Sequence, residues 1–198
     1  MIKSKQDYKE YVEQDKLANG FANRSVLRKV RDLFFPNPIK RFLELLRKYE
    51  YLNNTKNRHK AIKYFRLFFV IKKFRKLSLK LGFSIPINVF GAGLSIPHYG
   101  TIIVNKATRV GKNCRLHAGV NIGASAGKKE APKLGDNIYI GPGAILFGDI
   151  EIANNITIGA NATINKSCME EDCVLAGTPA QIIKRGFPIW WKNNKIKL

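Results

Sequence analysis

Apolar residues recur at every sixth position through the second half of the chain. The series is Val110, Leu116, Ile122, Leu134, Ile140, Leu146, Ile152, Ile158 and Ile164, and Lys128 is the one member that breaks it. The residue four positions further on is small or apolar in nearly every unit, as at Cys114, Val120 and Ala144. Helices repeat at about 3.6 residues and strands at about 2, so neither produces this rhythm. A persistent period of six predicts a triangular coil, in which each unit forms one side.

We therefore expect a left-handed parallel β-helix over residues 83–183. Glycine and asparagine adopt left-handed backbone conformations readily, and residues such as Gly135 and Asn137 supply the sharp corners between sides. An earlier apolar stretch that ends at Ile102 has the same period, but it is offset by two residues before Val110.

Residues 1–80 contain a single glycine and show apolar residues at helical spacing. Ser4 and Ser25 are typical helix caps. Four helices are expected, which end near Ala18, Pro36, Leu52 and Leu81. The fold class is therefore α+β, with an α-helical domain over residues 1–82, the β-helix over 83–183 and a basic tail over 184–198.

Positive charge is concentrated in the helical half. The chain carries 35 Lys and Arg against 14 Asp and Glu, a net charge of +21, and residues 1–80 hold 22 of the former and 7 of the latter. Such a surface attracts anions, among them lipids and cofactor phosphates. The expected helix over residues 57–81 mixes aromatic residues with cations. It either packs on the β-domain or lies on an anionic membrane surface. No nucleic-acid-binding motif is present.

The amino terminus has no signal-peptide pattern, and no apolar run is long enough to span a bilayer. We expect a cytoplasmic protein. A peripheral association with the inner face of the membrane is compatible with this expectation. The three cysteines form neither a disulfide framework nor a zinc-binding spacing.

The six-residue rhythm breaks at two places, which are the candidate sites of chemistry. One is Pro97-His98 and the two-residue offset that follows; the other is the polar excursion over residues 123–133. The segment IPHYGTIIVNKATRVGKNCRLHAGVNIG resembles bacterial serine acetyltransferases, and so do IGPGAILFGDIEIANNITIGANATINKSC and VLAGTPAQIIK. The resemblance covers about residues 85–185. The segment SIPINVFGAGLSIPHYGTIIVN most resembles homologues that are encoded among capsule and exopolysaccharide genes.

The resemblance implies acetyl-CoA as co-substrate, no metal, and a homotrimer or a multiple of trimers with coenzyme A between subunits. The family's catalytic histidine falls on His98, a suitable general base at neutral pH. His117 is a second candidate acid/base or acceptor contact. Backbone amides around Ala124 and Ser125 are candidates for stabilising the oxyanion. Further positions expected to contact coenzyme A are Gly141, Pro142, Gly159, Ala160, Gly177, Thr178, Lys184 and Arg185.

Two positions depart from the family pattern. Serine acetyltransferases have Asp where this chain has Pro97, and a second histidine where it has Ala131. Both groups serve the amino-acid acceptor in the family, so we expect a sugar hydroxyl of a surface polysaccharide or its precursor instead. The alternatives are a serine O-acetyltransferase of cysteine biosynthesis and a non-catalytic membrane-binding scaffold. A zinc-dependent coil of the carbonic-anhydrase type needs three histidines, and the coil has only His98 and His117.

Overall fold

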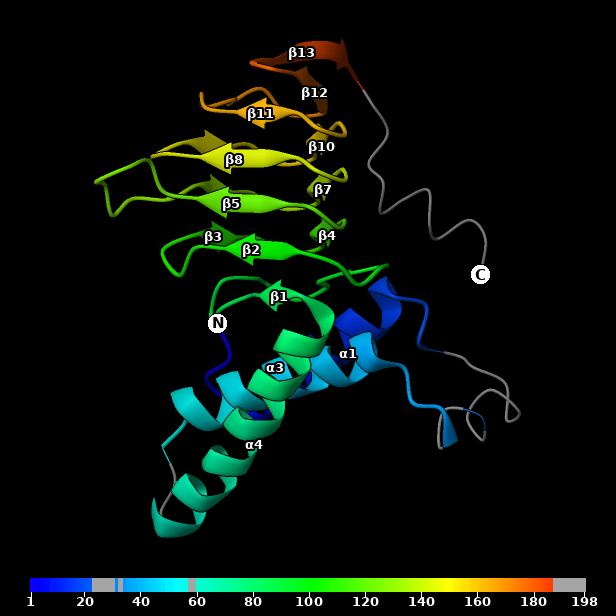
Figure 1. The fold of residues 1–198 in the computed structure, drawn as a ribbon, viewed down its shortest axis with the longest axis vertical. Helices are drawn as coiled ribbons and strands as arrows, with labels where there is room; N and C mark the ends of the chain where they lie inside the picture. The colour runs from blue at the N-terminus through cyan, green and yellow to red at the C-terminus, as the bar shows by residue number, and fades with distance from the viewer. Residues whose placement is uncertain (23–30, 32–33, 57–59, 187–198) are drawn as a thin grey trace.

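The chain forms a helical base that carries a left-handed parallel β-helix (Figure 1). This is the predicted α+β architecture. The computed structural model describes residues 1–22, 31, 34–56 and 60–186. Most of the helix expected after Ser25 lies outside the described residues, and so does His59. Within the described residues, no helix is long and apolar enough to cross a membrane.

Within the described residues, the base consists of α1 (Lys5–Ala18), α3 (Pro38–Asn54) and α4 (Lys60–Leu81). The predicted cap of α1 is confirmed, because the Ser4 hydroxyl accepts a hydrogen bond from the Asp7 amide and the Asp7 carboxylate accepts one from the Ser4 amide. The Phe42 ring stacks on Phe74 of α4 at 5.3 Å and meets Phe83 edge-on at 5.0 Å. Since Phe83 begins the coil, these rings join the helical core to the coil core.

The coil has three sides. The first is β1 (Phe83–Ser84), β2 (Ile102–Val104), β5 (Asn121–Gly123), β8 (Ile145–Phe147) and β11 (Thr163–Ile164). The second is β3 (Arg109–Val110), β6 (Lys133–Leu134) and β9 (Glu151–Ile152). The third is β4 (Arg115–Leu116), β7 (Tyr139–Ile140), β10 (Thr157–Ile158), β12 (Cys173–Gly177) and β13 (Ala180–Arg185). Among the strands of the described residues, only β12 and β13 pair antiparallel, and they form a hairpin through Lys184 and Arg185, which we had placed in the tail.

Strand register accounts for both breaks in the rhythm. A regular turn takes 18 residues, as from Ile145 to its partner Thr163. Asn121 pairs with Ile145, 24 positions further on, because the excursion inserts six residues. Phe90 pairs with Val110, 20 positions further on, which is the two-residue offset.

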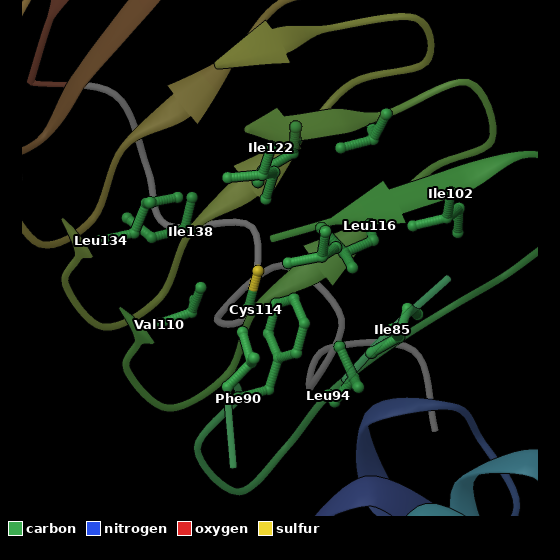
Figure 2. Packing of buried hydrophobic residues seen from close by; sticks show 14 of the residues in the cluster. Ile85, Phe90, Leu94, Ile102, Val110, Cys114, Leu116, Ile122, Leu134 and Ile138 are labelled. Atoms are coloured by element: carbon green, nitrogen blue, oxygen red, sulfur yellow. The ribbon is translucent and has the colours of Figure 1, made fainter. Parts of the chain in front are cut away.

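Every apolar member of the six-residue series is buried, whereas Lys128 in the excursion is exposed. Figure 2 shows Phe90, Val110, Cys114 and Leu116 pointing into the interior of the coil. Burial raises the pKa of the Cys114 thiol, so this cysteine is a core residue and not a nucleophile.

Asparagines build one corner. Asn113, Asn137 and Asn155 all have positive φ, between 57° and 62°. The Asn113 amide donates to Asn137 at 2.9 Å, and the Asn137 amide donates to Asn155 at 2.8 Å. The side chains therefore form a ladder that satisfies the polar groups of the corner as the coil ascends.

A buried ionic network fastens the helices to the first turn of the coil. Arg47 donates two hydrogen bonds to Asp15, one to Glu50 at 2.9 Å, and two to the carbonyls of Phe90 and Gly91 at 2.9 and 2.7 Å. Asp15 in turn accepts from two coil amides. Burial alone would lower the pKa of Arg47, but the two carboxylates raise it overall, so the guanidinium remains charged.

Candidate functional site

His98 lies at the corner between the third side of the coil and β2. Just before it, Ser95 bridges Arg115 of the next turn. The Asn19 side chain accepts a hydrogen bond from the Ile96 amide at 2.9 Å and donates one to the Leu94 carbonyl at 2.8 Å. The helical base thus holds the backbone two residues before His98.

The other end of the His98 loop is also fixed to the helical base. The Gly100 amide donates to the carbonyl of Leu81, the last residue of α4, at 3.0 Å. Gly100 has φ 137°, a conformation that side chains disfavour. The His98 side chain is exposed at the tip, and within the described residues its ring makes no hydrogen bond. An imidazole whose backbone is fixed and whose ring faces solvent is accessible to a hydroxyl group.

A polar cluster faces His98 from the next turns. The His117 ring centroid lies 6.2 Å from that of His98 and 5.0 Å from that of Tyr139. Arg115 Nε donates to His117 Nε2 at 3.4 Å. Partial burial, then the positive charge of Arg115, and then His98 lower the pKa of His117, which is therefore neutral at physiological pH.

The sequence analysis overlooked Arg115 and Tyr139. The strand register could have identified this pair. Tyr139 is 24 positions after Arg115, which equals one regular turn plus the six inserted residues, and the two residues pair. Both belong to the third side, next to the His98 corner. Burial lowers the pKa of Arg115, although this leaves the guanidinium cationic.

The lowered pKa of His117 predicts a loss of stability in acid. Above the ordinary histidine value of about 6.5, folded and unfolded chains are both neutral at this position. As the pH falls through that value, the unfolded chain binds a proton that the folded chain does not, so the free energy of unfolding decreases. Urea unfolding at about pH 7.5 and about pH 5.5 should show a smaller decrease in His117→Gln than in the wild type. Equal decreases in the two proteins would contradict the assignment.

Small residues continue the corner above His117. Backbone hydrogen bonds run from the His117 amide to Ile140, from Gly141 to Ile158, and from Gly159 to Leu175, so residues 117, 141, 159 and 176 stack in one column. A Cβ at Gly141 would lie 2.8 Å from the Ala160 amide nitrogen. Gly141 is buried, so glycine is required there because the backbone of the next turn approaches too closely for a side chain.

The other expected cofactor contacts border this column. Pro142 and Ala160 are exposed beside the two glycines, and Gly177 and Thr178 are exposed in the turn of the final hairpin. Arg185 is already paired with Glu170, at 2.6 Å between exposed side chains. Lys184 is exposed on the same strand.

The excursion lies at a different corner from His98. It joins β5 on the first side to β6 on the second side, and it contains Ala124 and Ser125. Within one chain the structure therefore does not bring Ala124 and Ser125 to His98. Ala131, at the end of the excursion, is buried in the coil. Among the described residues, no group of three metal-binding side chains is present.

The chain is similar to known serine acetyltransferases. No protein-family model matches the chain. It is 34% identical over 102 residues to the serine acetyltransferase of Mycobacterium tuberculosis, covering 50% of this chain and 44% of that protein. It is 31% identical over 97 residues to that of Synechococcus elongatus, covering 48% and 39%. The chain thus spans less than half the length of these relatives.

Solved structures share the fold over both halves of the chain. A crystal structure of serine acetyltransferase from Brucella abortus matches with a TM-score of 0.67 and 22% identity, covering 91% of this chain and 70% of that one. The Neisseria gonorrhoeae protein matches with a TM-score of 0.67 and 21% identity, covering 93% and 69%. This chain has a serine acetyltransferase-like hexapeptide-repeat fold. The segments matched by sequence to the two relatives, 102 and 97 residues, are about as long as the coil.

These comparisons contradict the prediction of a polysaccharide acceptor. The relatives from both bacteria, and also those from Staphylococcus aureus, are serine acetyltransferases. The prediction relied on two substitutions, Pro97 and Ala131. Each removes one side chain of a site that keeps His98 exposed and places Arg115, His117 and Tyr139 nearby, so neither substitution identifies a new acceptor.

Proposed function

We propose that this chain is an acetyl-CoA-dependent serine O-acetyltransferase with His98 as its general base. The observation that carries the proposal is the place of His98. It is an exposed imidazole at a coil corner, at the foot of a column of small residues, on a coil similar to serine acetyltransferases. An imidazole accepts a proton efficiently near neutral pH.

The reaction follows from this placement. His98 takes the proton of the serine hydroxyl as its oxygen attacks the thioester carbonyl of acetyl-CoA. The carbon–oxygen bond forms, and the tetrahedral oxyanion then collapses with cleavage of the carbon–sulfur bond. The imidazolium returns its proton to the departing thiolate, so O-acetylserine and coenzyme A leave, and His98 is again neutral.

Two solved neighbours support the choice of ligands. The Brucella abortus enzyme has been crystallised in complex with coenzyme A, and the Neisseria gonorrhoeae enzyme in complex with serine. In this chain, the corner above His117 offers coenzyme A a path along the exposed residues Pro142 and Ala160 toward Gly177 and Thr178 of the final hairpin.

The charge of the cluster suits an amino-acid acceptor. Arg115, His117 and Tyr139 include a cation and no carboxylate. Arg115 is half-buried, where a charge interacts more strongly with an anionic ligand than it does in bulk water. We infer that Arg115 attracts the serine carboxylate and directs the hydroxyl to His98, which takes over part of the role of the acceptor-binding groups missing at positions 97 and 131.

We also infer that the complete site forms between subunits of a homotrimer. His98 and the excursion occupy different corners of one coil. Three-fold packing of coils sets one corner of each subunit against another corner of its neighbour. The amides of Ala124 and Ser125 of one subunit are then candidates to stabilise the oxyanion formed at His98 of the next.

Mixing two inactive variants tests this shared site. His98→Ala removes the base, whereas a double change of Ala124→Pro and Ser125→Pro removes the excursion amides. Co-refolded at equal amounts, the variants should recover about a quarter of wild-type activity, because about one interface in four joins an intact base to an intact excursion. Activity that stays at the level of the separate variants would place the whole site within one subunit.

The acceptor is tested by thiol release from acetyl-CoA with and without L-serine, with mass spectrometry of the product. The proposal expects serine-dependent release and O-acetylserine. Folded protein that binds acetyl-CoA but gives no serine-dependent release would contradict the choice of acceptor.

A further inference from the structure

The outward face of α4 is apolar in its amino-terminal half. Val70, Phe74 and Leu81 form the buried face of this helix. Phe65, Phe68 and Phe69 are turned away from that face, with exposed fractions of 66%, 62% and 43%. Their rings contact one another, with centroids 4.8 Å apart between Phe65 and Phe69 and 5.5 Å apart between Phe68 and Phe69. Clustered aromatic residues in solvent mark an interaction surface more specifically than scattered ones do.

The same face becomes cationic in its carboxy-terminal half. Positions 69, 73, 76 and 80 follow one another at spacings of four, three and four, so the three lysines continue the line of Phe69. They border a groove of about 710 Å³ between the helices, which is also lined by Lys16, Arg41 and Lys48. Glu44 is the acidic residue of that lining.

The charge of α4 determines which kind of binding partner complements this face. Residues 60–81 contain eight Lys and Arg and no Asp or Glu. A second copy of the helix would therefore bring like charges together with no acidic residue of α4 to pair them. The coil of the same chain does not cover the face, since α4 extends away from it (Figure 1). An anionic, partly apolar surface complements both halves of the face.

We propose that α4 docks on anionic phospholipid bilayers. The Phe65, Phe68 and Phe69 rings enter the boundary between headgroups and acyl chains, and the lysines along the groove bind lipid phosphates. The helix lies on the surface and does not span it. The coil then projects from the membrane with its His98 end nearest the lipid. This inference does not depend on the reaction that the coil catalyses.

Flotation of the full chain with vesicles tests the proposal. We expect binding to phosphatidylcholine vesicles that contain about 30% phosphatidylglycerol, no binding to pure phosphatidylcholine, and weakening by salt. Phe65→Ser, Phe68→Ser and Phe69→Ser together should weaken binding at least about tenfold. Lys73→Glu with Lys76→Glu should weaken it more than about 25-fold, because each basic residue near an anionic surface strengthens binding about fivefold.

Matched controls lie on the coil. Lys106→Glu with Lys112→Glu makes the same charge change, and Met169→Ser with Ile183→Ser removes exposed apolar groups at the far end. Both should bind vesicles as the wild type does. Equal losses in the control and α4 variants, or no binding of the wild type, would overturn the proposal. A dimer in solution that the triple aromatic variant dissociates would assign the face to a second copy and would also overturn it.

Discussion

Replacement of Arg47 by Met should lower the free energy of unfolding by about 3–5 kcal/mol. The Arg47 guanidinium is fully buried, and its removal leaves the carboxylates of Asp15 and Glu50 buried without their cation. It also leaves the carbonyls of Phe90 and Gly91 without their donors. The loss is measured by urea unfolding with far-ultraviolet circular dichroism.

An exposed arginine on α4 provides the control. Arg75→Met makes the same chemical change in solvent and should alter the free energy of unfolding by less than about 0.5 kcal/mol. If Arg47→Met proved no more destabilising than Arg75→Met, the network would not hold the helices to the coil. Combining Arg47→Met with Asp15→Asn and Glu50→Gln should recover part of the stability, since the unpaired charges are then removed as well.

Replacement of His98 by Ala should reduce kcat with acetyl-CoA and L-serine by about 10²–10⁴-fold. The His98 ring is exposed and makes no hydrogen bond within the described residues, so its removal should leave the free energy of unfolding nearly unchanged. Because the proposed role of His98 is to accept the proton in the transition state, the KM for acetyl-CoA should change little. Stopped assays of O-acetylserine and urea unfolding measure the two effects separately.

Histidine replacement elsewhere and chemical rescue make this test specific. His59→Ala removes a histidine from the basic segment over residues 1–80, away from the coil sequence, and should keep wild-type activity. Added imidazole should restore part of the activity of His98→Ala, because a diffusing base can occupy the vacated position. A His98→Ala protein with wild-type kcat would require another base.

The sequence predicts the coil well because its signal is local and repeated. Each six-residue unit specifies one side by its own apolar residue, and the same choice recurs at Leu116, Ile140 and Ile158. A missing unit or an offset then stands out, and the register shows both as insertions of six and two residues. The helix cap at Ser4 is equally local.

The contacts that position the site were not predictable in the same way. In a chain with 35 basic residues, nothing nearby in sequence distinguishes Arg47 from a solvated cation. Its partners are Asp15, 32 residues before it, and carbonyls more than 40 residues after it. The sequence likewise indicates that Asn19 ends a helix, and it does. Its side-chain amide also holds the backbone before His98, which the sequence did not indicate. Such roles depend on how the helical base meets the coil.

The candidate site shows the same limit at larger scale. A resemblance assigns roles to His98 and Ser125 together, yet the three-sided coil places them at different corners. The closed turn shows that a single chain does not bring the two together. The mistaken sugar acceptor had a related origin, because single missing side chains were interpreted without the cluster of Arg115, His117 and Tyr139 around them.

The rate of coenzyme A release from acetyl-CoA on addition of L-serine tests the central claim most directly. It is measured for the wild type and for His98→Ala at equal folded concentration. The account predicts serine-dependent release by the wild type and a loss of at least about 100-fold in the variant. Serine-dependent release that is equal in the two proteins, or absent from a wild type that binds acetyl-CoA, would contradict it.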